Sequence, residues 1–105
     1  MEITPDQQQQ ARFWRKYLRL TRAGVPVLRA FQIVEDESDD ACWKAVAHEL
    51  RRGIERGTSL SEAMLEGSYS FSLSVLEMIR TAERRGAWDD ILEELVDGLL
   101  DGTFE

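Results

Sequence analysis

Residues 57–64 read Gly-Thr-Ser-Leu-Ser-Glu-Ala-Met, and within them one helix ends and the next begins. Gly57 can take the left-handed conformation that closes a helix, because it has no Cβ atom to clash. Ser59 can cap the following helix, and Glu62, at its third position, can reach back to complete a capping box. Residues 82–92, Ala-Glu-Arg-Arg-Gly-Ala-Trp-Asp-Asp-Ile-Leu, repeat the stop at Gly86, after two arginines that suit the negative end of a helix dipole. Two such junctions indicate an array of short helices.

Similar signals divide the whole chain into six expected helices, with no convincing strand. A capping Thr4 begins the first helix, Gly24 ends it, and Pro26 is expected as the first residue of the second. The expected helices cover about residues 4–23, 26–34, 38–56, 60–65, 72–84 and 88–100. Connections of a few residues force neighbouring helices to run antiparallel. The sequence therefore predicts an all-α fold, a compact six-helix bundle of short antiparallel helices.

Each longer helix has one apolar side with residues at helical spacing. In the second helix this side includes Val27 and Leu28, and in the sixth it extends to Leu100. Cys42 is interpreted as a small buried side chain. The side chains expected in the core are Phe13, Leu18, Phe31, Trp43, Leu50, Ile91, Leu95 and Leu99.

The length of 105 residues and the mass of 12.1 kDa suit a single domain, residues 1–105, with one core. Residues 1–10 are predicted to be a polar N-terminal extension or the first helical turns. No apolar run approaches the roughly 20 residues that cross a bilayer, and the first residues lack the pattern of a secretory signal. A single cysteine excludes an internal disulfide bond.

The net charge of −7 is spread unevenly along the chain. Residues 1–34 sum to +4, whereas residues 35–50 and residues 84–105 each sum to −5. So acidic a molecule repels nucleic acid unless a strong local basic patch overcomes its field. Nucleic acid is therefore not expected as a partner.

The residue types offer little material for catalysis. His48 is the only histidine and has no companion ligand at metal-binding spacing, and the chain has no glycine-rich phosphate loop. The acidic clusters at 36–40 and 89–94 suit the positive ends of helices and lack the spacing of a calcium-binding loop. We expect no enzyme activity, no cofactor and no structural metal.

The first expected helix carries a basic stripe at offsets of 3, 4, 7 and 10 residues: Arg12, Arg15, Lys16, Arg19 and Arg22. One interpretation of this stripe is an ordinary solvated face. The other is a docking surface for an acidic partner or for anionic lipid headgroups. The acidic sixth helix of a second copy could also cover it and form a weak homodimer. The sequence leaves these alternatives open.

Four blocks in a fixed order carry a resemblance to a known family. The blocks are Phe13-x-Arg15-x-x-Leu18-x-Leu20-x-x-Ala23-Gly24-Val25-Pro26-Val27-Leu28-x-Ala30-Phe31, Gly57-x-Ser59-Leu60-x-x-Ala63-Met64, Phe71, and Glu83-x-x-Gly86-x-x-Asp89-x-Ile91-Leu92. Together they resemble the cytoplasmic F domain of bacterial type II secretion and type IV pilus inner-membrane platform proteins, over about residues 11–100. In this resemblance the structural motif comprises Gly24, Pro26, Gly57, Ser59, Leu60, Ala63, Glu83 and Gly86. The sequence departs from the family pattern at Ala82 and Trp88, where glycine and leucine are usual, and lacks a common proline around Phe71.

The resemblance implies a non-catalytic adaptor at the cytoplasmic face of the bacterial inner membrane. Such domains link a hexameric assembly ATPase and inner-membrane assembly proteins to the growing pilus or pseudopilus. The family motif singles out Glu83, so the residues expected to bind a partner are Glu83 and the basic stripe. The simpler interpretation of Glu83 is a carboxylate that accepts hydrogen bonds from nearby backbone or arginine donors.

Family members normally carry two such domains and membrane-spanning helices. The resemblance therefore implies either a membrane-proximal part of a longer chain or a free-standing relative. The alternative function is that of a free-standing soluble helical adaptor or regulator with the same fold and no role in secretion.

Overall fold

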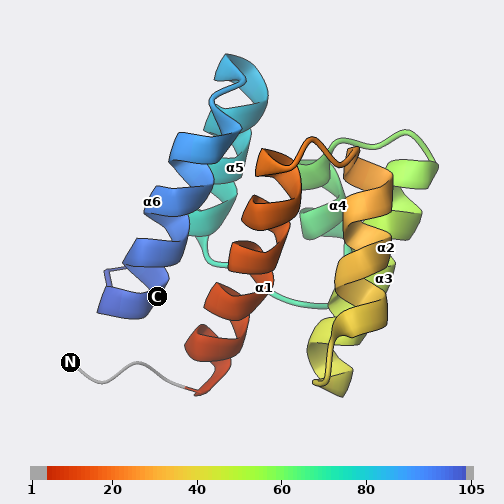
Figure 1. Cartoon of the computed structure of the whole chain (residues 1–105), viewed down its shortest axis with the longest axis horizontal. Coiled ribbons are helices and arrows are strands. Elements are labelled where there is room, and N and C mark those ends of the chain that lie inside the picture. Colours follow the sequence, from red (N-terminus) through yellow and green to blue (C-terminus); the bar gives the residue numbers. More distant parts are fainter. Residues whose placement is uncertain (1–4, 104–105) are drawn as a thin grey trace.

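The computed structural model describes residues 5–103 (Figure 1). Helix-ending and helix-capping residues divide this part of the chain into separate helices. This part of the chain forms six α-helices and no strand, which confirms the predicted all-α class. The helices are α1 (Pro5–Arg22), α2 (Val27–Glu37), α3 (Ala41–Glu55), α4 (Leu60–Glu66), α5 (Leu73–Arg85) and α6 (Trp88–Asp101).

The junctions at 57–59 and 86–88 form as the sequence predicts. Gly57 and Gly86 have φ angles of 97° and 73°, in the left-handed region that favours glycine. The capping box of α4 is present: the Glu62 backbone N–H donates to Ser59 Oγ at 3.2 Å, and the Ser59 backbone N–H donates to Glu62 Oε1 at 3.4 Å. Pro26 lies at the N-cap of α2, one residue before the helix. The predicted cap at Thr4 lies outside the described residues.

The end of α2 and the start of α3 differ by two or three residues from the sequence prediction. Helix α2 continues to Glu37, through half of the expected acidic turn, and α3 then begins at Ala41 rather than at Ser38 or Asp39. The N-cap of α3 is Asp40, whose side chain accepts a 2.9 Å hydrogen bond from the Trp43 backbone N–H. The backbone of Asp40 is extended, with φ −91° and ψ 122°, as is usual for an N-cap residue.

Aromatic residues form the centre of the core, where α1 packs between α6 and α2. Phe13 and Tyr17 on α1 meet Phe31 of α2, and Tyr17 stacks on Phe31 with ring centroids 4.5 Å apart. Seven of the eight side chains expected in the core are buried. The exception is Ile91, which is half-buried because it lines an open groove between α5 and α6.

Four apolar side chains that the pattern turns inward lie at the surface instead. Val27 and Leu28 are each 40% exposed, and Leu100 is 38% exposed. Cys42 is also exposed, which overturns its interpretation as a buried side chain. It lies about 100° around α3 from the buried Trp43, because consecutive helical residues diverge by that angle.

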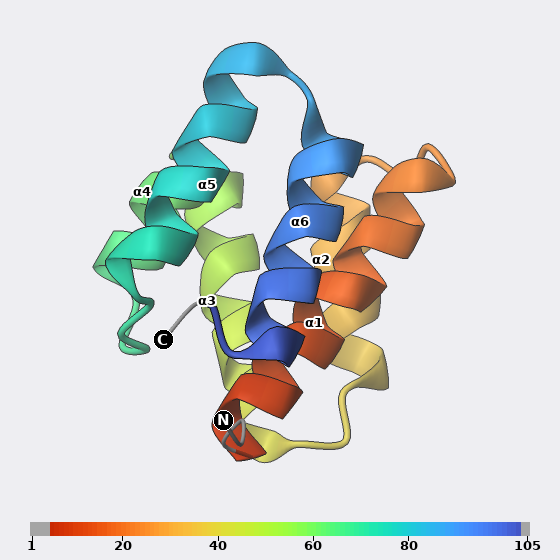
Figure 2. The ribbon, with the colours of Figure 1, turned by 90° about the vertical axis from the view of Figure 1, so that its left-hand side faces the viewer.

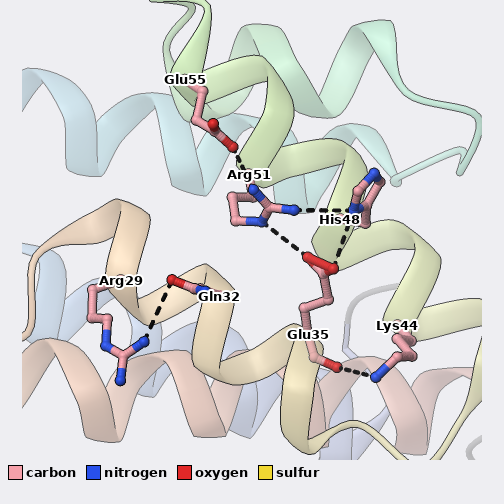
Figure 3. A network of polar contacts seen from close by, with 7 residues as sticks. All are labelled: Arg29, Gln32, Glu35, Lys44, His48, Arg51 and Glu55. Carbon is pink, nitrogen blue, oxygen red and sulfur yellow. Dashed lines mark hydrogen bonds and ion pairs between the residues drawn. The ribbon is translucent and has the colours of Figure 1, made fainter.

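A polar network centred on Glu35 joins α2 to α3 (Figure 3). Glu35 Oε1 accepts a 3.0 Å hydrogen bond from Arg51 Nε, and its Oε2 lies 3.1 Å from His48 Nδ1. Lys44 Nζ donates to the backbone carbonyl of Glu35 at 2.9 Å. Partial burial raises the pKa of Glu35, but the hydrogen bonds from Arg51 and His48 outweigh it and hold that pKa below its ordinary value. His48 thus has a place in an interhelical ion-pair network.

Helices α3 and α4 approach closely at Gly53, which is buried in the last turns of α3. A Cβ atom at this position would lie 2.8 Å from the Cβ of Ala63. Because real Cβ atoms essentially never come so close, only glycine fits here without a shift of α4. The sequence analysis did not single out Gly53.

Candidate functional site

Three helix junctions meet at one end of the bundle, the upper end in Figure 1. They connect α1 to α2, α3 to α4 and α5 to α6, and they contain Gly24, Gly57 and Gly86. Three of the four blocks that carry the family resemblance include these junctions; the fourth, Phe71, lies between α4 and α5. Residues far apart in the sequence are therefore brought to a common end of the molecule.

A groove of about 400 Å³ opens between the three junctions. Each junction contributes to its wall: Tyr17 and Val25 from the first, Thr58 and Leu60 from the second, and Glu83 and Trp88 from the third. The exposed Val27 also lines it. A partly apolar groove with one carboxylate is the usual form of a binding site for a partner side chain or a small ligand.

Glu83, on α5, forms hydrogen bonds with the first turn of α4 and holds it in place. Its Oε1 accepts a 2.6 Å hydrogen bond from the Ser61 hydroxyl, and its Oε2 accepts a 3.0 Å hydrogen bond from the Ser61 backbone N–H. The backbone N–H groups of a first helical turn have no partner within the helix, so a carboxylate suits this position. Glu83 accepts from a backbone donor, as its simpler interpretation predicts.

A second carboxylate, Glu49 of α3, binds the chain just beyond the C-terminal end of α4. Glu49 accepts hydrogen bonds from both the hydroxyl and the backbone N–H of Ser68, the latter at 2.9 Å. These bonds hold the pKa of Glu49 below its ordinary value. A helix of seven residues is too short to be stable alone, so α4 depends on its neighbours. Sequence reasoning missed Glu49, because no local pattern connects it to Ser68.

Tyr17 forms a rigid aromatic wall of the groove. It is 5% exposed, and its ring meets that of Trp88 edge-on at 6.5 Å. The pKa of Tyr17 is raised to about 12, chiefly by burial; a hydrogen bond with Thr21 lowers it, and the charge of Glu83 adds a smaller upward effect. The phenol therefore stays protonated at neutral pH. Trp88 also lines the groove, and Ala82, the other position where the sequence departs from the expected family pattern, is fully buried.

The structure divides the basic stripe of α1 into paired and unpaired side chains. Lys16 forms an ion pair with Glu37 of α2, and Arg22 forms one of 2.8 Å with Glu93 of α6. The three remaining arginines are exposed and form no ion pair with any described residue: Arg12, Arg15 and Arg19. They form an exposed row, called the arginine row below.

Residues 5–103 contain no group of three or more His, Cys, Asp or Glu side chains that could hold a metal ion. Within the same range, every helix is too short or too polar to cross a membrane. The conspicuous surface features of the domain are therefore the junction groove and the charged faces of its helices.

These features describe a small all-α domain with a groove at one end of its helices. The family model described as "Type II secretion system (T2SS), protein F" matches residues 13–102. The chain therefore belongs to the type II secretion system protein F family, as its resemblance implies.

The chain is also similar to several pilus and secretion proteins. It is 31% identical over 91 residues to a type 4 fimbrial assembly protein PilC of Pseudomonas putida, covering 87% of this chain and 22% of the relative. It is 27% identical over 99 residues to the type IV pilus assembly protein PilC of Thermus thermophilus, covering 94% of this chain and 24% of the relative. A type II secretion system protein F of Xanthomonas campestris pv. campestris is 31% identical over 87 residues, covering 83% and 22%. The matched part of each relative is less than a quarter of its length.

Proposed function

We propose that this chain is a cytoplasmic, non-catalytic adaptor domain of an inner-membrane platform protein in a type II secretion or type IV pilus machine. Its role is to link the assembly ATPase and inner-membrane assembly proteins to the growing pilus or pseudopilus. Membership of the protein F family supports this role, as do the names of relatives that assemble pili or secrete proteins.

The arginine row is the observation that carries the docking function. It presents three cations that form no ion pair with any described residue, on a molecule whose net charge is −7. Cations at offsets of 3 and 4 along a helix match carboxylates at the same spacing on a partner helix. Complementary charge of this kind speeds encounter and selects the partner. An acidic surface of the ATPase or of a membrane-anchored partner is the ligand that fits.

The junction groove is a second candidate contact surface, near the C-terminal end of α1. Tyr17, on α1, forms part of the wall, and Glu83 shapes it by holding α4 in place. Glu83 thus contributes to partner binding through its hold on α4.

The test measures binding of the chain to the assembly ATPase of its own organism by biolayer interferometry. Reversal of two cations in R15E/R19E is expected to weaken binding at least about tenfold, since close charge pairs at interfaces are worth about 1.5 kcal/mol or more. The matched control is R52E/R56E on α3, whose arginines are also exposed and form no ion pair with a described residue. Both variants should stay folded, with similar small decreases in melting temperature, because Arg19, Arg52 and Arg56 all lie near the C-terminal ends of their helices.

Equal binding by wild type and R15E/R19E would refute docking through the arginine row. If that variant instead loses self-association in sedimentation equilibrium, the row belongs to a homodimer. Deletion of the gene separates the proposal from a free-standing adaptor or regulator, because only the platform role predicts loss of secretion or piliation.

A further inference from the structure

A second groove, of about 280 Å³, lies between α5 and α6. Figures 1 and 2 show these two helices side by side, on the other side of α1 from α2. Met78 and Ile91 line the groove with half-buried apolar side chains, and Thr81 lies beside them. Glu77 and Glu94 complete the lining. The groove thus combines apolar surface with carboxylates from both helices.

The exposed side of α6 next to this groove is acidic over its whole length. The helix has six acidic and no basic side chains: Asp89, Asp90, Glu93, Glu94, Asp97 and Asp101. Glu93 is neutralised by Arg22, and Asp101 accepts hydrogen bonds from Thr103. Among the others, three exposed residues form a row along the helix, with the second and third 4 and 7 positions after the first: Asp90, Glu94 and Asp97. None of the three forms an ion pair with a described residue. We call these three residues the acidic row.

The α5 side of the groove is more balanced in charge. Glu77 is paired with Arg80 at 3.0 Å, and Arg84 donates a hydrogen bond of 3.4 Å to the Thr81 hydroxyl. The uncompensated negative charge therefore lies on the α6 side alone. A ligand that complements the groove needs an apolar side chain over Met78 and Ile91 and cations over α6.

We propose that the groove between α5 and α6 docks a basic amphipathic helix of a partner protein. An apolar side chain of that helix enters between Met78 and Ile91, while its lysines or arginines face the acidic row. Amphipathic helices bind grooves in this manner, with the apolar residue as anchor and the flanking charges setting orientation. The proposal goes beyond the docking function above, because it assigns a second face, of opposite charge, to a different partner helix.

The test is an NMR titration of the ¹⁵N-labelled chain with a Leu/Lys amphipathic peptide of about 18 residues, the length of five helical turns. Amide shifts are expected to change at residues 77–81 and 90–97. The test variant carries D90N, E94Q and D97N. It should bind the peptide about tenfold more weakly, because it loses the three facing charges.

The matched control changes the net charge by the same amount at exposed acidic residues that form no ion pair with a described residue. It carries D36N, D39N and E66Q. This control should bind like wild type. An equal loss in both variants would mean attraction by net charge alone and would overturn the proposal.

A second peptide keeps every lysine and replaces each leucine by serine. It should bind about tenfold more weakly than the Leu/Lys peptide, because burial of one leucine side chain is worth about 1.5–3 kcal/mol. Equal affinity of the two peptides, or shift changes confined to other helices, would exclude the groove. Wild-type self-association that disappears in the acidic-row variant would show that a second copy, not a partner helix, occupies this face.

Discussion

Gly53 offers a sharp test of the packing between α3 and α4. In the Gly53→Ala variant the new Cβ atom would lie 2.8 Å from the Cβ of Ala63 and 3.2 Å from Oγ1 of Thr58. Ordinary contact begins at 3.4 Å, so α3 and α4 have to separate by about 0.6 Å. Helix α4 cannot move freely, because Glu83 holds Ser61 at one end and Glu49 holds Ser68 at the other.

Two opposing effects set the magnitude for Gly53→Ala. Alanine is favoured over glycine inside a helix by about 1 kcal/mol. Overpacking of a tight core site costs about 1–3 kcal/mol, and the fastened α4 places this site near the upper end. We therefore expect a net loss of about 1–2 kcal/mol in the free energy of unfolding. The melting temperature should fall by about 4–8 °C for each kcal/mol.

The assay is urea denaturation followed by the fluorescence of the three tryptophans. The matched control is a double-mutant cycle with Ala63→Gly, which removes the opposing Cβ. That change alone should cost about 1–2 kcal/mol through lost helix propensity and one lost methyl group. The double variant should be more stable than the sum of the single effects by about 1 kcal/mol or more. A Gly53→Ala variant more stable than wild type, or additive effects, would refute the close approach.

Three further changes test the fastening of α4 and the core. Glu83→Ala should cost about 2 kcal/mol, since it removes two charge-assisted hydrogen bonds to Ser61, and should speed amide exchange in α4; unchanged exchange would contradict this. Leu95→Ala should cost about 2–5 kcal/mol in urea denaturation, because Leu95 is fully buried; a loss below about half a kcal/mol would count against that burial. The pKa of Glu49 is lower in the folded state, so its stabilising effect is present above its ordinary pKa and lost as pH falls through the folded pKa. The stability difference between wild type and Glu49→Gln should therefore shrink on acidification, and a difference that grows would contradict the sign.

The helices and most of the core were predictable because their signals are local. A glycine stop, the Ser59 and Glu62 pair, and apolar residues at helical spacing each act within a few residues of the chain. Val27 and Leu28 are exceptions, because the helical pattern predicts them to be buried and they are exposed. They follow Pro26 in the first turn of α2, at the end of the bundle where the junction groove opens, so part of their surface remains in solvent. Periodicity identifies an apolar side but not how far the neighbouring helix extends to cover it.

The fastening of α4 could not be predicted, because it joins residues distant in the sequence. Glu83 and Ser61 are 22 positions apart, and Glu49 and Ser68 are 19 positions apart. The family resemblance drew attention to Glu83 without indicating its partner. Glu49 carried no signal of its own. Gly53 lay unremarked within a helical pattern, and only the position of Ala63 explains why it lacks a side chain.

The charge of the basic stripe on α1 also depends on the fold. Ion pairs that form on folding reduce the charge that the stripe can offer to a partner. The sequence contains five cations in that stripe, but folding pairs Lys16 with Glu37 and Arg22 with Glu93. Exposed pairs of this kind add little stability, yet they reduce the charge available to a partner. The side chains left without an ion pair to a described residue include three arginines on α1 and, on the neighbouring α6, the acidic row together with Asp89 and Asp101. The Arg22–Glu93 pair joins α1 to α6 and leaves the unpaired arginines on α1 and the unpaired carboxylates on α6, so the two proposed docking faces differ in sign.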